Sequence, residues 1–452
     1  MASTSLKRTI GSATGTTKGT FSCWVKRGNL GSGADGRMFS SWGSSTSQFW
    51  IIFQTDTISI ADYDGSYNLQ YVTNRVFRDT SAWYHIVVAI DTTQGTSGDR
   101  VKLYVNGVQE TSFSTSTAPS QNQVLNFSNN GEEFRIGERD SGEYLDGSMT
   151  HIHFTDGYAY TASTFGETDS TSGIWKAKTS PSVTYGNNGF FLKFENSGAM
   201  GTDSSGNTNT FTVSGTLTQN VDTPDNNFCT NNPLDNYYYS SAFSNGNTTI
   251  VSSSSTGKYS YGTTTFGIPD GKKIYCEVKM VAVSSGSIQA RVGLISYPTT
   301  SATISVGSTT YTYGYNTDSG NIVTGNAGSS YGNSFALGDI MGIAVDTVNN
   351  KLYFSKNGTW QNSGNPESGA TGTGAVSIAD LGTTNSTNSG HYFLGFSDEA
   401  NNAGATLSWN FGNGVFGTTA ISSAGTAAST TGKFEYDVPT GYQPLSTKGL
   451  NA

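Results

Sequence analysis

A pair of glutamates, Glu138 and Glu143, is the first feature of the sequence that could do chemistry, and Asp140 lies between them. Two carboxyl groups about 5–5.5 Å apart on one strand face can act as acid and nucleophile in glycoside hydrolysis. Here the spacer residues are Arg, Asp, Ser and Gly, a composition typical of a turn. We therefore expect both glutamates to lie on a solvated loop without a catalytic role.

Two histidines, His151 and His153, occupy alternate positions of a strand-like run. On a strand they would point to one face, where a third ligand could complete a zinc site. Ile152 and Phe154 would then pack in the core, so we expect both histidines on the open surface, without a metal. His85 and His391 are expected to be structural, because no serine or cysteine nucleophile pattern accompanies them in the sequence.

A turn-like stretch provides the first candidate ligand-binding residues, Asp62, Tyr63 and Asp64, and Tyr67 and Tyr71 follow it. Loop carboxylates can bind calcium, but calcium requires several converging oxygen ligands and only two are evident. We therefore predict no metal or other cofactor. Asp62, Tyr63, Asp64 and Tyr67 remain candidates for contact with a sugar.

Three alternating tyrosines, Tyr311, Tyr313 and Tyr315, form the second candidate group, with Tyr331 as a possible neighbour. Alternation places the three rings on one face of a strand. There they could stack on sugars, fill a subunit contact or pack in the core. The run 237–239, three further tyrosines, is expected to pack at the domain junction.

The elements that position these residues are β-strands. Aromatic residues make up 12% of the chain, more than disordered tracts carry, and 56 glycines supply turns. The run 83–90 alternates and is apolar on both faces, as in the middle strand of a sandwich. After the strand-like run 101–105, Asn106-Gly107 is a strong hairpin signal. The fold class predicted is all-β, with antiparallel sandwiches.

Charge and cysteine content narrow the functional classes. The formal net charge is −9 and the basic residues are scattered, which argues against nucleic-acid binding. Three cysteines, Cys23, Cys229 and Cys276, follow no zinc or disulfide pattern, so we expect buried thiols and synthesis in a reducing cytoplasm. The first residues resemble no signal peptide, and no apolar run is long enough to insert into a membrane.

A sequence pattern that occurs twice predicts two domains. A buried strand ending in Asp, a loop and a Lys-Leu-Tyr strand ending in Asn-Gly occur in 86–107 and again in 341–358. The segment between the copies is rich in Asn, Asp and Pro. We predict a domain at 1–217, a linker at 218–240 and a second domain at 241–452. The aromatic end of the chain after 431 is expected to form a closing strand or strap.

Several motifs of the first domain resemble the laminin-G/concanavalin A-like jelly roll. They are Trp24-Val25-Lys26-Arg27, Asn74-Arg75-Val76-Phe77-Arg78-Asp79, Trp83-Tyr84-His85, Lys102-Leu103-Tyr104-Val105-Asn106-Gly107 and Leu145-Asp146-Gly147. The first domain is more narrowly similar to a version found in tailed phages. That version is carried by Gly173-Ile174-Trp175-Lys176, Gly189-Phe190-Phe191-Leu192-Lys193-Phe194 and Gly201-Thr202-Asp203.

The second half resembles a SPRY domain, also a concanavalin A-like sandwich. Its motifs are Gly338-Asp339-Ile340, Gly342-Ile343-Ala344-Val345-Asp346, Leu352-Tyr353-Phe354-Ser355-Lys356-Asn357-Gly358 and Asn410-Phe411-Gly412. The motifs of both halves are mostly structural, so the resemblance to these families predicts the fold of this chain better than its activity.

The resemblance implies a bacteriophage virion surface protein: a tail fibre, spike, appendage or capsid decoration exposed on the particle. Its expected partners are other virion proteins and host surface glycan, and we expect a homo-oligomer without enzyme activity. One alternative is a phage polysaccharide depolymerase, because Glu138 and Glu143 share the spacing of laminarinase-type hydrolases on this fold. Another is a free bacterial lectin, which the missing secretion signal disfavours.

Overall fold

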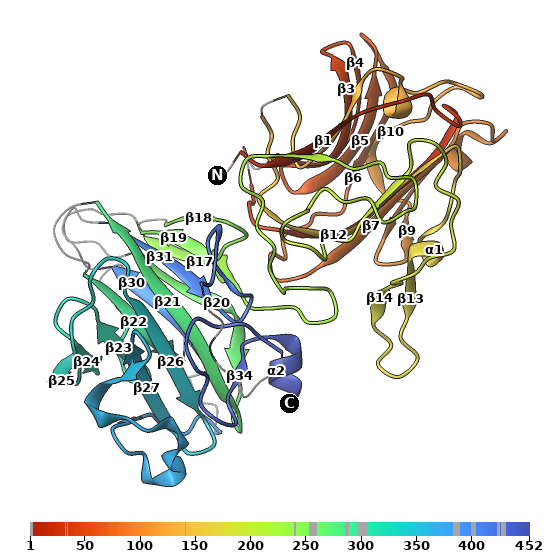
Figure 1. The fold of residues 1–452 in the computed structure, drawn as a ribbon. Helices are drawn as coiled ribbons and strands as arrows, with labels where there is room; N and C mark the ends of the chain where they lie inside the picture. The colour runs from red at the N-terminus through yellow and green to blue at the C-terminus, as the bar shows by residue number, and fades with distance from the viewer. Residues whose placement is uncertain are drawn as a thin grey trace. The chain divides into compact units, whose positions relative to one another are not determined.

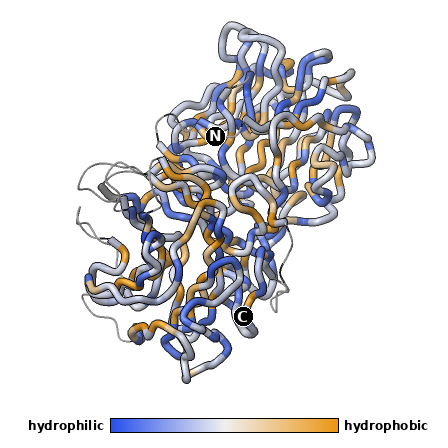
Figure 2. Tube along the Cα trace, turned by 60° about the vertical axis from the view of Figure 1, so that its left-hand side comes forward, coloured by the Kyte–Doolittle hydropathy of each residue, from blue (hydrophilic) through white to orange (hydrophobic). Residues whose placement is uncertain are grey.

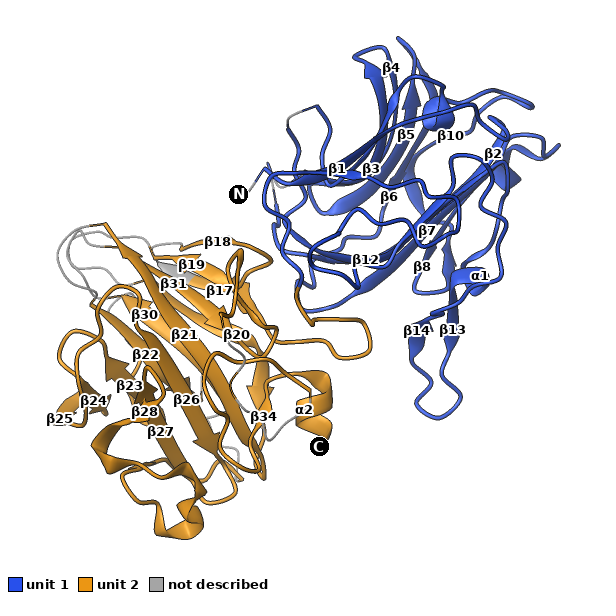
Figure 3. Cartoon of the chain, in the orientation of Figure 1, with its two compact units in different colours: residues 1–219 blue, residues 220–452 orange. Residues whose placement is uncertain are grey.

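The computed structural model divides the chain into two compact units, residues 1–219 and 220–452 (Figure 3). It describes residues 3–31, 33, 35–140, 142–238, 241–252, 260–284, 289–296, 305–382, 389–398, 404–422, 425 and 431–452. The division lies within the segment 218–240, for which the sequence predicted a linker.

Unit 1 contains a larger sheet of eight strands among its described residues (Figure 1). In spatial order these are β10 (Phe113–Thr117), β6 (Tyr67–Thr73), β5 (Thr57–Tyr63), β4 (Ser47–Gln54), β3 (Gly36–Ser44), β11 (Glu133–Ile136), β1 (Ser5–Thr9) and β16 (Thr212–Ser214). Neighbouring strands pair antiparallel, and the β4–β5 register places Trp50 opposite Ala61.

The second sheet of unit 1 has six strands in the described part of the chain. In order they are β15 (Phe190–Leu192), β12 (Gly147–Asp156), β2 (Lys18–Arg27), β7 (Tyr84–Asp91), β8 (Val101–Val105) and β9 (Val108–Glu110). The two sheets pack face to face: Phe39 of β3 stacks on Phe21 of β2 with ring centroids 4.9 Å apart. This buried aromatic layer is the core of a β-sandwich.

The outer face of the six-stranded sheet is covered by the segment 157–185. This segment includes the short helix α1 (Ala162–Phe165) and the hairpin of β13 (Gly166–Thr168) and β14 (Trp175–Ala177). Phe165 and Trp175 pack on Val87, which points away from the core. The middle strand β7 is therefore buried on both faces, as its apolar run predicted.

Unit 2 is a second sandwich. In the part of the unit that is described, one sheet has seven strands: β17 (Asn231–Tyr238), β20 (Ser260–Ile268), β30 (Tyr392–Asp398), β22 (Ala290–Ile295), β23 (Thr312–Asn316), β24 (Asn321–Thr324) and β25 (Ala327–Ser330). The other, larger sheet has nine strands, also counted in the described part. Its main path is β18 (Ala242–Ser244), β19 (Thr249–Val251), β31 (Ala405–Asn410), β21 (Lys273–Val283), β26 (Ile340–Asp346), β27 (Lys351–Lys356) and β28 (Thr359–Trp360), and β29 (Val376–Ser377) and β34 (Gln443–Pro444) pair with β27 and β21. Buried residues of both sheets form one core.

Short elements complete the two units. In unit 1 they are the 3-10 turns η1 (Ser97–Asp99) and η2 (Asn126–Ser128). In unit 2 they are η3 (Gln361–Ser363), η4 (Pro366–Thr371), β29 (Val376–Ser377), the hairpin β32 (Val415–Phe416) and β33 (Thr419–Ala420), β34 (Gln443–Pro444) and α2 (Thr447–Asn451). Figure 2 shows stretches of apolar residues running through the interior of each unit, with polar residues common at the edges.

The end of the chain forms the predicted strap. Within this C-terminal strap, residues 431–446, Phe434 and Tyr442 lie on Tyr275 and Tyr353 of the larger sheet. Strand β34 pairs parallel with β21. The strap therefore closes part of the outer face of this sheet.

The predicted linker 218–240 is wrong for most of its length. Phe228 and Cys229 are buried in unit 2, and the Cys229 amide donates to the Leu445 carbonyl at 2.9 Å. Strand β17 then pairs with β20. The polar composition that suggested a linker reflects the turn between Thr223 and Asn226, whose backbones bond to each other.

Candidate functional site

The outer face of the eight-stranded sheet carries a group of aromatic side chains. Along β4, Phe49 and Ile51 enter the core, so Trp50 points outward and stays partly exposed. Tyr67, 47% exposed, contacts Trp50 with ring centroids 6.1 Å apart and Tyr63 with centroids 5.1 Å apart. Both contacts are edge-to-face, and Tyr67 is the most exposed of the three rings.

Guanidinium groups lie over one face of each tryptophan on this side of the sheet. The Arg37 Cζ atom is 5.0 Å from the Trp50 ring centroid, and the Arg139 Cζ atom is 5.1 Å from that of Trp42. Glu143 joins the two arginines, with Oε2 2.7 Å from Arg37 Nε and Oε1 2.9 Å from Arg139 Nη1. We call Arg37, Trp42, Trp50, Tyr63, Tyr67 and Arg139 the ring–guanidinium face.

Glu143 stays ionised in this network. Burial alone would raise the pKa of its carboxyl group, but the charges and hydrogen bonds of Arg37 and Arg139 lower it below its ordinary value. Burial lowers the pKa of Arg37, against the opposing effect of Glu143. Glu143 therefore holds two arginines in place and has no proton to donate to a leaving group.

Glu138 lies in a different setting from the one expected. Its side chain is 1% exposed, with Oε1 2.6 Å from Lys7 Nζ and 3.5 Å from Arg135 Nη1. The predicted turn is present, since the Arg139 amide donates to the Gly142 carbonyl at 2.9 Å. The expectation of a solvated Glu138 is wrong because Lys7 and Arg135 compensate its buried charge.

Asp62 is also buried, although the sequence placed it in an exposed turn. Its oxygens accept hydrogen bonds from the Asn126 amide at 2.6 Å and from Asn68 Nδ2 at 3.0 Å. Burial raises the pKa of this carboxyl group to about 6. Asp62 thus fastens η2 to the end of β5, and it is not available to an external ligand.

Asp64 is exposed and accepts a hydrogen bond from Ser66 Oγ at 3.3 Å. Among the described residues, no group of three His, Cys, Asp or Glu side chains could hold a metal ion. Of the four candidates in this stretch, the structure thus brings only Tyr63 and Tyr67 together on the open face.

His151 and His153 do not form a pair on the surface. The β12–β2 register shifts between Thr150 and His153, and His151 has a φ of 48° at this bulge. His153 is 1% exposed and stacks on Phe191 with centroids 3.9 Å apart. The expectation of two surface histidines therefore fails for His153, which the segment 157–185 covers.

His85 lies 2.9 Å from the Oγ of Ser22, an arrangement that could suggest a nucleophile and its base. However, Trp175 Nε1 donates to His85 Nδ1 at 2.9 Å, so the neutral ring carries its hydrogen on Nε2. Burial lowers the pKa of His85 to about 3. A neutral imidazole that donates to Ser22 cannot accept its proton, so His85 is structural, as expected. His391 is exposed.

The tyrosine group in unit 2 faces the core. Tyr315 is 0% exposed and donates to the Asn333 carbonyl, and the Tyr313 hydroxyl accepts from the Ala379 amide at 2.9 Å. Tyr331 packs edge-on against Tyr315. The alternation correctly placed Tyr313 and Tyr315 on one face, but it is the inner face. The three-tyrosine surface is therefore not formed, and Tyr311 also packs against the core.

The cysteines are buried and free, as expected. Burial raises the pKa of the Cys23 and Cys276 thiols, which keeps them protonated and unreactive. The side chains of the tyrosine run 237–239 lie outside the described residues.

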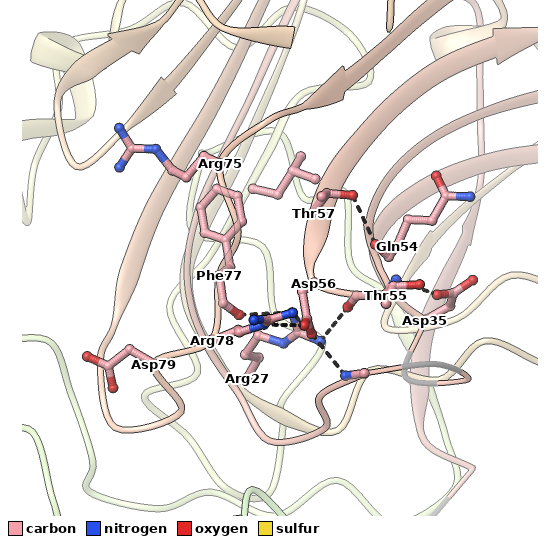
Figure 4. Close-up of polar contacts among 12 residues, drawn as sticks. Arg27, Asp35, Gln54, Thr55, Asp56, Thr57, Arg75, Phe77, Arg78 and Asp79 are labelled. Carbon is pink, nitrogen blue, oxygen red and sulfur yellow. Dashed lines mark hydrogen bonds and ion pairs between the residues drawn. The ribbon is translucent and has the colours of Figure 1, made fainter. Parts of the chain in front are cut away.

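The motif residues Arg27, Phe77 and Arg78 meet around Asp56 (Figure 4). Arg27, 2% exposed, donates to the carbonyls of Phe77 at 3.0 Å and Thr55 at 2.8 Å. Asp56 accepts from Arg78 Nε at 2.6 Å and from the Gly31 amide at 2.9 Å. This cluster fixes the segment after β6 to the β4–β5 hairpin, and its role is structural.

Comparison with protein families matches each unit separately. Residues 3–163 match the concanavalin A-like lectin/glucanases superfamily, and residues 273–375 match the SPRY domain. The chain therefore carries an N-terminal concanavalin A-like domain and a C-terminal SPRY domain. No curated protein matches the chain in sequence.

Similar solved structures include two SPRY domains and a toxin. A human SPRY domain is 18% identical, with a TM-score of 0.28, and the match covers 36% of this chain and 90% of that one. The SPRY domain of human HERC1 is 17% identical, with a TM-score of 0.30 and coverages of 40% and 96%. Stonustoxin is 15% identical, with a TM-score of 0.27 and coverages of 40% and 27%.

In the part of the chain that is described, no helix is long and apolar enough to span a membrane. The sequence reasoning missed Arg37, Trp42, Trp50 and Arg139 as members of the open face. The order Phe49, Trp50, Ile51 was the available signal. Side chains on a strand alternate between its two faces, so a residue between two core residues points outward.

Proposed function

We propose that the chain is a non-catalytic recognition protein on the surface of a bacteriophage particle and binds host glycan through the ring–guanidinium face. The observation that carries this proposal is the sheet face on which the exposed Tyr67 contacts both Trp50 and Tyr63, while the buried Arg37 lies over the Trp50 ring. Aromatic faces pack on the C–H faces of sugar rings, and the partly exposed guanidinium of Arg139 can donate to their hydroxyls.

The ion pairs around this face hold equal numbers of cations and anions, so it carries no excess positive charge and favours a neutral glycan. Four cations and four anions take part in the ion pairs: Lys7, Arg37, Arg135 and Arg139 with Glu133, Glu138, Asp140 and Glu143. An uncharged sugar can bind here without disturbing that balance. An acidic sugar would compete with Glu143 for Arg37 and Arg139.

The experiment that tests glycan recognition is binding of the full chain to an array of bacterial surface polysaccharides, followed by calorimetry on the best ligand. Trp50→Ala and Tyr67→Ala should each weaken binding by roughly tenfold, since each removes a stacking surface. Tyr158→Ala removes a tyrosine that is 36% exposed at another place on unit 1 and serves as the matched control. Equal affinities of Trp50→Ala and the control would disprove this binding face.

The particle assignment rests on the resemblance of the first domain to its tailed-phage version and has its own test. Mass spectrometry of purified virions should detect the chain, and immunogold labelling should place it on the particle surface. The same particles would reveal the proposed contacts with other virion proteins, and the native mass of the isolated chain would report its oligomeric state. Absence from purified virions would end the particle assignment and leave the glycan proposal standing.

The depolymerase alternative has less support. Both glutamates of its motif are tied to cations, Glu138 to Lys7 and Arg135, and Glu143 to Arg37 and Arg139. We expect the chain to release no oligosaccharide from a polysaccharide that it binds. Release of products that Glu138→Gln abolishes would restore the alternative.

A further inference from the structure

A second candidate site lies on the outer face of the larger sheet of unit 2. An open hollow of about 220 Å³ is floored by β19, β21 and β31, which lie side by side in Figure 1. The hairpin of β32 and β33 forms its wall. The side chains used below are Asn245, Thr249, Lys279, Val281, Ser408 and Phe416.

Lys279 contributes a positive charge that nothing in the described residues balances. Its Nζ lies 5.8 Å from the centroid of the Phe416 ring, which fixes the direction of the side chain. Two other lysines in the strands of this sheet are paired, Lys273 with Asp346 at 3.0 Å and Lys356 with Asp339 at 2.9 Å. No acidic residue lines the hollow.

The floor also offers one spare hydroxyl hydrogen. Asn245 Nδ2 donates to Thr249 Oγ1 at 3.1 Å, and Thr249 Oγ1 lies 2.9 Å from Ser408 Oγ. The two hydroxyl groups share one hydrogen bond between them, in whichever direction it runs. One of their two hydrogens is thus left without an acceptor among the described residues, and an oxygen atom in the hollow could accept it.

We propose that this hollow binds the carboxylate of a hexuronate residue in an acidic polysaccharide. The carboxylate pairs with the Lys279 ammonium and accepts the spare hydrogen of Thr249 or Ser408, and the sugar ring packs on Val281 and Phe416. Val281 is 45% exposed and provides the apolar surface for this contact. The choice of a sugar as carrier rests on the proposed glycan recognition, but the site is on unit 2 and needs no residue of the ring–guanidinium face.

The test is calorimetric titration of the full chain with an oligogalacturonate, a neutral oligoglucoside of equal length and sodium acetate. The oligogalacturonate should bind, and more weakly as ionic strength rises. Lys279→Met keeps the side-chain stem on Phe416 but removes the charge, and should weaken binding at least about tenfold. Ser408→Ala should change binding much less, because the Thr249 hydroxyl still has a hydrogen to donate to the carboxylate.

Lys448→Met is the control, since Lys448 is an exposed lysine of the same unit. Circular dichroism on each variant confirms that the fold is retained. Unchanged binding in Lys279→Met, or equal binding of the neutral oligomer, would overturn the proposal. Acetate binding as tightly as the oligogalacturonate would overturn the assignment to a sugar. Trp50→Ala changes only the ring–guanidinium face. If this variant loses binding to a neutral glycan, the result for the hollow in unit 2 is unaffected.

Discussion

The imidazole of His85 lies between the indoles of Trp24 and Trp175, with ring centroids 4.8 and 5.9 Å away. Both ring nitrogens have partners, Ser22 and Trp175. Protonation would place a second hydrogen against the Trp175 N–H, in surroundings that cannot solvate a charge. His85 is therefore a buried neutral group whose ionisation opposes folding.

A pH dependence of unit 1 follows from this burial. The pKa of His85 is about 3 and that of His153 is also lowered, whereas in the unfolded chain both are near 6.5. As pH falls below about 6.5, the unfolded chain binds protons that the folded chain does not. The free energy of unfolding then falls by up to about 1.4 kcal/mol per pH unit for each histidine.

Urea unfolding of wild type and His85→Gln at pH 7 and pH 5.5, followed by tryptophan fluorescence, measures this effect. The variant should be less stable at pH 7 but should lose less stability on acidification, because one titrating group is gone. Equal losses in the two proteins would show that His85 does not resist protonation.

Asp56 supports the buried Arg27 in the same unit. Burial would raise its pKa, but the Gly31 amide, Arg78 and Arg27 together lower it. We expect Asp56→Asn to destabilise unit 1 by about 3–5 kcal/mol, because a buried guanidinium loses its counter-charge. Denaturant unfolding measures the change. Asp99→Asn is the matched control: Asp99 is itself exposed and its partner Lys102 is only partly buried, so loss of this ion pair should cost at most about 1 kcal/mol.

At the scale of elements, the C-terminal strap is held by a buried carboxylate. Glu277 of β21 is 0% exposed and accepts from the amides of Glu435 and Tyr436, each at 2.9 Å. Asn410 Nδ2 and the Tyr275 hydroxyl also donate to it. A segment whose only regular secondary structure is the two-residue strand β34 thus gains fixed hydrogen-bond partners as well as aromatic contacts.

The aromatic part of the strap can be tested at Tyr442, which is 0% exposed and donates to the Pro366 carbonyl at 3.2 Å. Tyr442→Phe removes this bond and should cost about 1 kcal/mol, whereas Tyr442→Ala also leaves a cavity and should cost about 3–5 kcal/mol. Hydrogen exchange should become faster in the strap and in β21 for Tyr442→Ala. Exchange that rises uniformly across unit 2 would contradict a local role for the strap.

Local sequence patterns predicted the strands and hairpins because their causes are local. Asn106-Gly107 and Asn357-Gly358 both have positive φ at both residues, which a two-residue hairpin turn of this type requires. The linker prediction failed at Phe228 and Cys229 because their burial depends on Leu445, more than 200 positions away. No local pattern contains that partner.

The candidate site was harder to predict. Alternation along a strand assigns its residues to two faces, but it does not show which face packs against the core. Tyr313 and Tyr315 were correctly placed together, yet the opposite sheet of unit 2 covers them. Glu138 was placed in solvent because Lys7, its partner on β1, is distant in the sequence. Tyr63 and Tyr67 were found because the strands that carry them are adjacent in the chain.

At the scale of the whole molecule, the two units repeat one hairpin on separate cores. In unit 1 the Asn106 side chain accepts from the His85 amide at 2.8 Å, and in unit 2 the Asn357 side chain accepts from the Ile340 amide at 2.8 Å. Each unit has its own pair of sheets and its own hydrophobic core in the described part of the chain. Each unit therefore has the contacts of an independent folding unit.

Calorimetry of the full chain should accordingly show two unfolding transitions with opposite pH dependence. Burial raises the pKa of Glu277 to about 7, so between its ordinary value near 4.5 and about 7 the folded unit 2 retains a proton that the unfolded chain releases. The stability of unit 2 therefore falls as pH rises from 5 to 7. The stability of unit 1 rises over the same interval, because the two histidines that must be neutral in the fold, His85 and His153, outweigh the opposing effect of the one raised carboxyl, Asp62.

Asp56→Asn identifies the transition of unit 1 by lowering its midpoint alone. Glu277→Gln should remove most of the pH shift of the other transition, since an amide does not titrate, and His85→Gln should reduce only that of unit 1. A single transition would contradict two independent cores. Two transitions that move in the same direction between pH 5 and pH 7 would contradict the opposing ionisations of Glu277 and the two histidines.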